Sequence, residues 1–585
     1  MQLLLQKKLT FSSYSSTSPQ IYHQYITRLS QICYRNVKKT LNLEINFSCG
    51  IISIRRLRRR VVMRKRVILF IILLFTIFLF LFSLYQKNLI FPSKDIVFVP
   101  LDSRPVNTQN VLLLTNMWGK NLILPPSDSL DYYKKPANFQ KLYSWLKTSV
   151  SHKRNYAIVI SLQQYLNGGL IASRQLENYT QYKEKLDLLY SFLKENKGKN
   201  VIIFSVIPRV TPSKEEYSDK LKRFSYLTDK IDLFHIPDDI KEKEKIVSSI
   251  PHQILDEYIN LFEINEKINK ALIDWTKKGI ITTFVIGIDD TQDYSISNMV
   301  ARRLQEYAEE QGISDRVYIL HGADEIGMEI TAKLANQYYR QSPAFKVIYD
   351  VENPEKTFLP YEGADLKKIV EEKIKFIGGK IDKNGDCLLY IHTRQNPGIK
   401  REVEKYKNNG QIFGIADVAY TNRADKELVE ILLNLDPLKI LYSGWNTPSN
   451  SIGAVISEMS LKRIMDKELI SFSQMEKAIK SFIAFSFIRY ADDFAYQAVV
   501  RNEMYKWAKL NNMSVYDIEL QTASKELAVK MGPILEKLKQ KYIGREVKIG
   551  RARVKIKNIE VKVKYPWNRM FEIEISPEIT LYNKR

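Results

Sequence analysis

The sequence predicts an α/β protein with a parallel sheet, and three observations support this fold class. Short apolar runs rich in Val and Ile alternate with amphipathic helical stretches from residue 95 onward. The runs are apolar without interruption, as in strands that are buried on both faces of a parallel sheet. Many of them end on polar residues, which is typical of the sheet edge where α/β proteins bind ligands.

Nine segments have the length and composition of buried strands. They are residues 96–102, 157–162, 201–207, 283–289, 317–324, 345–350, 387–392, 412–417 and 438–444. Helical patterns such as 179–197 and 254–278 fill the gaps between them. Eight or nine strand–helix units suit a (β/α)8-barrel-like core over residues 95–452. The alternative is that 345–420 forms a separate doubly wound lobe.

The chain changes character after residue 452. Residues 453–541 show helical patterns without a strand signal, so we expect a helical region there. Within the last segment, 542–585, polar and apolar residues alternate, which predicts a small antiparallel β-sheet.

The net charge of +24 does not indicate a nucleic-acid-binding body. Residues 1–66 contain 14 Lys or Arg and one acidic residue, whereas the remainder contains 75 Lys or Arg and 64 Asp or Glu. Binding of nucleic acid would need a concentrated basic face in the folded part, and none is visible. We therefore expect no nucleic-acid partner.

Residues 67–86 predict one transmembrane helix. The stretch from Val67 to Tyr85 is apolar and uncharged, and its length matches a bilayer-spanning helix. Eight basic residues between 55 and 66 would keep the basic segment 1–66 in the cytoplasm and place the rest outside the cell membrane. A cleaved signal peptide is the alternative. Met63 begins a conventional leader, so 1–62 could reflect a mis-assigned start.

Cysteine and histidine usage predicts no metal site and no cofactor. Only Cys387 follows the apolar segment, and no Cys spacing of the zinc-binding type exists. His321 and His392 are the histidines near predicted strand ends. The cluster at 289–293 could alternatively supply oxygen ligands to a hard cation, although it lacks a calcium-loop glycine.

Two predicted strands end on paired carboxylates, Asp289-Asp290 and Asp324-Glu325. The pairs are 35 residues apart, which corresponds to one strand–helix unit and places them on neighbouring strand ends. Two carboxyl groups in different environments can divide the roles of acid and base. We therefore predict a carboxylate-driven catalytic site at Asp289, Asp290, Asp324 and Glu325.

Further polar residues lie at or near the other strand ends and are candidates for binding a polyhydroxylated ligand. They are Asp102, Arg104, Asn107, Asn167, Arg174, His321, Asp417, Trp445 and Asn446. Asp492 and Asp493 in the helical region are added as a wall of the site, although an ion-paired packing face with Arg489 at i, i+4 is the stronger interpretation. Pro208-Arg209 also follows a predicted strand. For single positions, the alternative is helix capping or turn formation.

The string from His321 to Glu325 resembles the His-x-Gly-Gly-Asp-Glu motif of retaining β-N-acetylhexosaminidases, with Ala323 at the second glycine. In that family the Asp orients the substrate acetamido group and the Glu protonates the leaving oxygen. The resemblance would make Asp324 the orienting residue and Glu325 the acid.

A longer set of strings resembles one bacterial family, the domain of unknown function 4127 proteins. The strings are VPLDSRPVN at 99–107, GGLIASR at 168–174, GADE at 322–325, GWNT at 444–447, RYADD at 489–493 and PWNR at 566–569. The resemblance spans roughly residues 95–580. It implies one family-wide unit and leaves the activity to be argued from the residues.

These patterns favour a membrane-anchored extracytoplasmic glycoside hydrolase that acts on envelope or environmental glycan. One alternative is a non-catalytic glycan- or envelope-binding protein with the same polar residues. Another is a metal-dependent hydrolase built on Asp102, Asp289 and His321.

Overall fold

The computed structural model describes residues 70–79, 95–151, 156–174, 179–211, 215–393, 398–406, 410–467, 469–550 and 552–582. The chain forms two compact units, Met1–Phe91 and Pro92–Arg585. In the first unit, residues 70–79 are helical and expose apolar side chains. No helix among the described residues has both the length and the apolar character needed to cross a membrane. The rest of the predicted span, 67–69 and 80–86, and all of 1–66 lie outside the described residues.

The first sheet of the second unit has six parallel strands in the order β2-β1-β3-β4-β5-β6. They are β1 (Asp95–Val99), β2 (Asn121–Ile123), β3 (Ala157–Ser161), β4 (Val201–Ile207), β5 (Thr283–Ile288) and β6 (Val317–His321). Its helices are α4 (Gln109–Met117), α5 (Phe139–Ser151), α6 (Tyr179–Glu195), α7 (Ser218–Phe234), α8 (Pro237–Ser248), α9 (His252–Lys277), α10 (Ile296–Glu310) and α11 (Ile326–Tyr339). Every residue of β3, β4 and β5 is buried, which explains their uninterrupted apolar sequences.

The second sheet has five parallel strands in the order β11-β10-β9-β7-β8. They are β7 (Ala344–Tyr349), β8 (Lys380–Ile381), β9 (Cys387–His392), β10 (Ile412–Asp417) and β11 (Ile440–Ser443). Its helices are α12 (Leu366–Phe376), α13 (Ile399–Tyr406), α14 (Lys426–Leu435) and α15 (Pro448–Asp466). Both sheets therefore place their second strand outside their first, which is the flavodoxin-like order of doubly wound folds.

The predicted α/β class is confirmed, and all nine predicted strands form. The closed (β/α)8 barrel expected over 95–452 is not the arrangement observed, because the parallel strands divide between two open sheets. The alternative of a second lobe describes the chain better, although that lobe continues past residue 420 to β11. The expected boundary at 452 falls inside α15.

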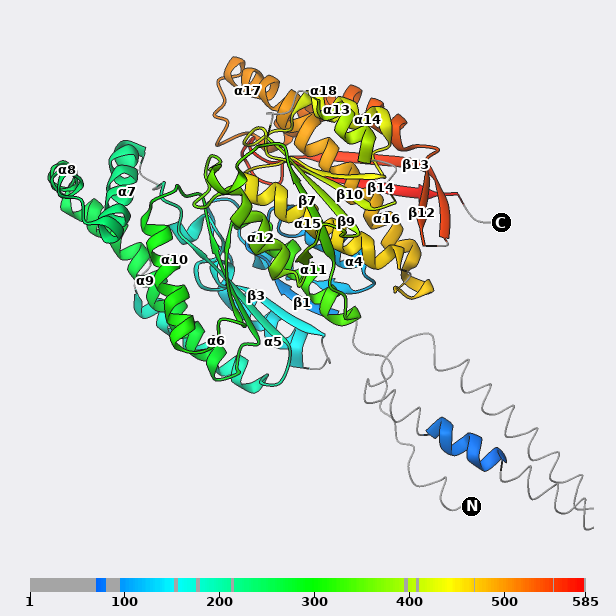
Figure 1. Ribbon diagram of the computed structural model, residues 1–585, viewed down its shortest axis with the longest axis horizontal. Coiled ribbons are helices and arrows are strands. Elements are labelled where there is room, and N and C mark those ends of the chain that lie inside the picture. The colour runs from blue at the N-terminus through cyan, green and yellow to red at the C-terminus, as the bar shows by residue number, and fades with distance from the viewer. Residues whose placement is uncertain are drawn as a thin grey trace, which may run out of the picture. The chain divides into compact units, whose positions relative to one another are not determined.

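Two buried helices explain why one barrel does not form. Residues 326–336 of α11 and 448–461 of α15 are buried without interruption, so these helices need protein on all sides. The helix α15 contacts α11, α4 and β10, and it lies with α11 between the two sheets (Figure 1). Close approach depends on Gly453 of α15, where a Cβ would lie 2.3 Å from Oε1 of Glu329.

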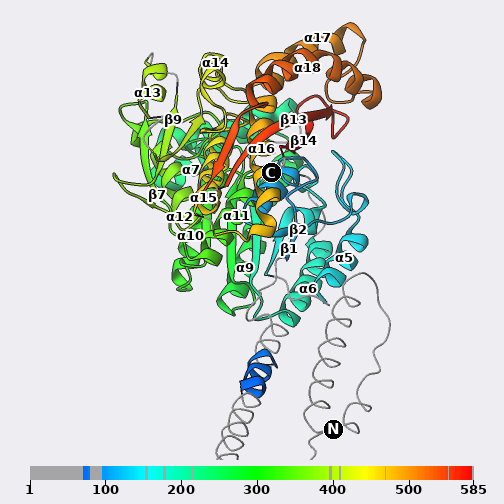
Figure 2. The ribbon, with the colours of Figure 1, turned by 90° about the vertical axis from the view of Figure 1, so that its right-hand side faces the viewer.

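The C-terminal region packs against both parts of this core. It contains α16 (Phe472–Arg489), the π-helix η6 (Tyr490–Val500), α17 (Arg501–Leu510) and α18 (Leu520–Tyr542). The small antiparallel sheet predicted at the end of the chain is confirmed as β12 (Glu546–Ile549), β13 (Ala552–Lys564) and β14 (Glu574–Leu581). The helix α16 packs on β14 and α18 packs on β13 (Figure 2).

Candidate functional site

A buried ion network joins the ends of β1 and β6. Arg104 follows β1, and its Nε donates to Oδ2 of Asp102 at 2.8 Å while its Nη1 donates to Oδ2 of Asp324 at 3.0 Å. Exposed fractions are 0% for Asp102 and 5% for both Arg104 and Asp324. Burial raises the pKa of Asp324, and the neighbouring Arg104 charge acts in the opposite direction. One guanidinium therefore fixes two carboxylates from distant parts of the sequence.

Two amides complete this network. The Nδ2 of Asn107 donates to Asp102 at 2.9 Å and to Asp324 at 3.2 Å. The Nδ2 of Asn446, from the loop after β11, donates to Asp324 at 3.2 Å. Asn446 has a φ of 64°, a left-handed conformation that Asn tolerates better than most residues. The structure thus brings together five of the sequence-predicted site residues, from both sheets.

The pair Asp289-Asp290 lies at the end of β5, beside this network. Asp289 is ion-paired with Arg174, whose Nη2 lies 3.3 Å from its Oδ2, and it also accepts a hydrogen bond from the backbone N–H of Asp290. Burial and the charge of Asp289 raise the pKa of Asp290 to about 7, with a smaller contribution from Asp324. The two carboxylate pairs are therefore electrostatic neighbours, and their environments differ.

Glu325 points away from Asp324. It has no exposed surface, and its Oε1 accepts a hydrogen bond at 2.6 Å from Lys373, which also donates to Glu329. The glycines Gly322 and Gly453 enclose it, since a Cβ on either would clash with its side chain. Burial raises the pKa of Glu325, and Lys373 opposes that shift. Glu325 belongs to an interior ion cluster of α11 and α12.

Three other predicted site residues have hydrogen-bond partners of their own. His321 contacts Glu372 through Nδ1 at 3.0 Å and lines a pocket of about 400 Å³ with it. Asn167 donates to the hydroxyl of Tyr182. Asp417 accepts hydrogen bonds from Tyr442 Oη and the backbone of Asp425, and burial raises its pKa to about 6.

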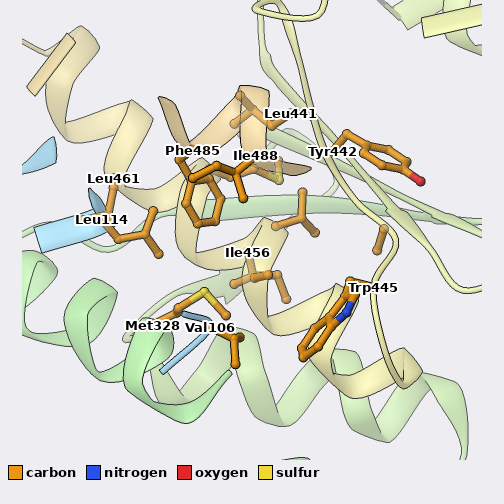
Figure 3. Packing of buried hydrophobic residues seen from close by; sticks show 14 of the residues in the cluster. Val106, Leu114, Met328, Leu441, Tyr442, Trp445, Ile456, Leu461, Phe485 and Ile488 are labelled. Carbon is orange, nitrogen blue, oxygen red and sulfur yellow. The ribbon is translucent and has the colours of Figure 1, made fainter. Parts of the chain in front are cut away.

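Trp445 is a residue of the hydrophobic core, and no hydrogen bond joins it to the ion network among the described residues. It is 4% exposed and lies in the hydrophobic core, which also contains Val106 and Ile456 (Figure 3). A sugar-stacking role for this indole therefore has no support from its position.

Asp492 and Asp493 lie on η6, and the predicted i, i+4 pair between Arg489 and Asp493 forms at 3.1 Å. Asp493 also accepts a hydrogen bond at 2.7 Å from the backbone N–H of Gly444. Asp492 accepts one from Gln497. Asp493 thus positions the loop that carries Asn446, and contact with a ligand is not needed to explain it.

Sequence reasoning did not select Asp131 as a site residue. Its Oδ1 accepts a hydrogen bond at 2.7 Å from the backbone N–H of Ser103, next to Asp102. Burial, followed by the charge of Asp102, raises the pKa of Asp131 to about 8. Asp131 follows the short strand β2, which was not predicted. Gly169 lies so close that a Cβ there would be 2.7 Å from Oδ2 of Asp131.

Arg209 and Trp567 are further residues that the candidate set lacked. Arg209 follows β4, and burial together with the charge of Arg174 lowers its pKa. The Nε1 of Trp567 donates to Oγ of Ser103 at 3.0 Å, and the guanidinium groups of Arg104 and Arg569 approach its ring at 5.8 and 4.9 Å. In the sequence, Arg209 is marked by its position directly after a predicted strand, and Trp567 is marked by the string PWNR at 566–569.

The three residues of the metal hypothesis have different partners: Asp102 with Arg104, Asp289 with Arg174 and His321 with Glu372. Among the described residues, no group of three or more His, Cys, Asp or Glu side chains is placed to hold a metal ion. The arrangement offers instead carboxyl groups of unequal acidity beside guanidinium groups.

Fold and site together define a two-sheet, doubly wound α/β protein with a carboxylate–arginine site at its strand ends. The chain matches the family described as "Protein of unknown function (DUF4127)" over residues 96–576, which include every residue of this site. It belongs to that family. No curated protein matches the chain.

Proposed function

We propose that the protein is a glycoside hydrolase in which Asp290 acts as general acid and Asp289 as the charged partner. The observation that supports this most is the pair at the end of β5. Asp289 is ion-paired with Arg174, whereas Asp290 is partly exposed and has a pKa of about 7. Two adjacent carboxyl groups with different environments suit an acid and an anion that act together.

In the proposed reaction, the glycosidic C–O bond breaks and the leaving oxygen takes the proton of Asp290. The Asp289 carboxylate faces the positive charge that develops on the sugar ring. Water then adds to the sugar carbon and returns a proton to Asp290. Asp324, held by Arg104 and Asn446, lies beside the pair, and its charge helps to keep the proton on Asp290.

The proposed general acid is Asp290, whereas the sequence motif predicted Glu325. An acid must reach the leaving group, and Glu325 has no exposed surface and is paired with Lys373. The substrate class remains envelope or environmental glycan, approached by an extracytoplasmic domain behind an anchor at 67–86. Both the substrate class and the location are proposals that rest on the sequence.

The test compares Asp290→Asn with Glu325→Gln in the hydrolysis of cell-envelope glycan and aryl glycosides. Asp290→Asn should lower kcat by about 10²- to 10⁴-fold, which is the usual contribution of a general acid. Glu325→Gln should keep most of the activity of each folded molecule. In wild type, kcat/KM should fall as pH rises through about 7, because Asp290 must be protonated.

Retained activity in Asp290→Asn, or selective loss in Glu325→Gln, would refute the assignment. Saturable binding of glycan without any turnover would favour the alternative of a glycan-binding protein.

A further inference from the structure

Two arginines lie beside the carboxylate pair, at neighbouring strand ends of the first sheet. Arg174 follows β3 through the π-helix η2 (Gln163–Asn167) and a single 3-10 turn, and Arg209 follows β4. The backbone N–H of Val210 donates to the carbonyl of Asp290 at 3.1 Å, which ties the Arg209 loop to the end of β5. Both arginines are partly exposed, so a ligand can reach them.

The hydrogen-bonding capacity of these guanidinium groups is not used up. Arg174 donates one Nη2 hydrogen bond to Asp289. The buried Nε atoms of Arg174 and Arg209 have no hydrogen-bond partner in the described part of the chain. A buried donor without a partner costs about 1–3 kcal/mol, so such atoms at a site call for a ligand group. The planar guanidinium fork matches the two oxygens of a carboxylate or phosphate.

The local charge also favours an anion. Arg174 and Arg209 are close enough for the charge of one to lower the pKa of the other. Asp289 opposes them as a carboxylate in the ion pair, while Asp290, with a pKa of about 7, carries only part of a charge near neutral pH. The next arginine, Arg569, is already paired with Glu572 at 2.8 Å. The two guanidinium groups therefore carry more charge than the carboxyl pair beside them as long as Asp290 holds its proton.

We propose that Arg174 and Arg209 form an oxyanion subsite that binds a carboxylate or phosphate group of the substrate next to Asp290. The inference rests on the proposed function for its substrate class and names an acidic sugar, such as a uronate or a sugar phosphate. A neutral sugar could offer hydroxyl acceptors to these guanidinium groups, but it would bring neither the negative charge nor the paired oxygens that match the guanidinium fork.

The test measures binding to the full chain by calorimetry, with D-glucuronate, inorganic phosphate and D-glucose as probes. The variants are Arg209→Gln and Arg174→Gln. The matched control is Arg223→Gln, an exposed arginine of the same lobe that pairs with Glu242. We expect saturable binding of at least one anion, weakened about tenfold or more in both site variants, as loss of a charge-assisted pair implies. Arg223→Gln should bind like wild type.

Preference for glucuronate over phosphate would indicate a uronate substrate, and the reverse would indicate a phosphorylated one. Equal anion binding by wild type and Arg209→Gln, or no anion binding by wild type, would overturn the subsite. If Arg209→Gln fails to fold, Arg209→Lys tests the same subsite, because Lys keeps the positive charge but lacks the planar guanidinium fork.

Binding to Asp290→Asn separates this inference from the proposed function. Anion binding in that variant, combined with no hydrolysis by wild type, would support the subsite and refute only the hydrolase. Hydrolysis of neutral glycan that does not depend on Arg209 would support the hydrolase and refute the subsite.

Discussion

The two parallel sheets share a strand order but differ in how their polar strand ends are satisfied. In the second sheet, His392 at the end of β9 bonds to Asp350 through Nδ1 at 2.9 Å and to Asp425 through Nε2 at 3.1 Å. Burial opposes the charged form of His392, but these two hydrogen bonds raise its pKa to about 9. Both histidine nitrogens have found partners within the fold.

In contrast to the fully paired His392, groups at the ends of β3, β4 and β5 in the first sheet keep hydrogen-bond donors or a proton available. The Nε atoms of Arg174 and Arg209 have no partner in the described part of the chain, and Asp290 keeps its proton up to about pH 7. Doubly wound topology places polar residues at the carboxyl edge of both sheets. Whether such an edge becomes a site depends on which groups the protein leaves unpaired.

The largest expected effect concerns the network of the second sheet. His392→Ala should lower the free energy of unfolding by about 3–5 kcal/mol, because it leaves Asp350 buried without its cation. Urea denaturation measures this, with the exposed His252→Ala as the control. Hydrolysis by the folded fraction should be unchanged. A stable His392→Ala protein without activity would make the second sheet edge part of the site.

A smaller effect should appear in the pH dependence of stability. The pKa of His392 is raised from its ordinary 6.5 to about 9, so its contribution is fully present below pH 6.5 and is lost as pH rises through about 9. The difference in unfolding free energy between wild type and His392→Ala should shrink over this range. The two proteins are compared at each pH because Asp131 and other buried carboxyl groups titrate in the same pH range and affect the unfolding free energy of both. A constant difference between pH 6 and 10 would contradict the two hydrogen bonds.

The smallest expected effect concerns the helices between the two sheets. Gly453→Ala should destabilise the protein by about 1–3 kcal/mol, because the added methyl group would lie 2.3 Å from Glu329 Oε1 and 2.5 Å from Glu325 Cγ. Thermal unfolding measures this, and Gly532→Ala on α18 is the control. Among the described residues, no atom beyond the two chain neighbours and the backbone of the same helix lies within 4 Å of a Cβ at Gly532, and the following Pro533 offsets the gain in helix propensity, so that variant should change the stability by less than about 1 kcal/mol. Equal stability of both variants would show that α15 and α11 are not closely packed there.

The sequence was sufficient for the strands of the core. Buried strands such as Val201–Ile207 are apolar at every position, and this pattern is visible in one short window. The edge strands β2 and β8 have only three and two residues and are partly or fully exposed, so no comparable pattern marks them. Asp131, which follows β2, was missed for the same reason.

The roles of adjacent carboxylates could not be read in the same way. Asp324 and Glu325 are neighbours in the chain, yet one bonds to Arg104 and the other to Lys373. These partners lie 220 and 48 residues away, so no local pattern distinguishes the two acids. Asp289 and Asp290 also differ in their partners, since only Asp289 is paired with Arg174.

The sequence by itself determined the α/β class, the core strands and the polar residues at their ends, because burial periodicity and turn chemistry are local properties. The tertiary structure alone decided that the strands form two open sheets and that Asp102, Arg104, Asp324 and Asn446 meet. An apolar strand does not specify its neighbour, and the pKa of a carboxyl group depends on charges brought to it from elsewhere in the chain. The division between a closed network and an open site is therefore a property of the folded molecule.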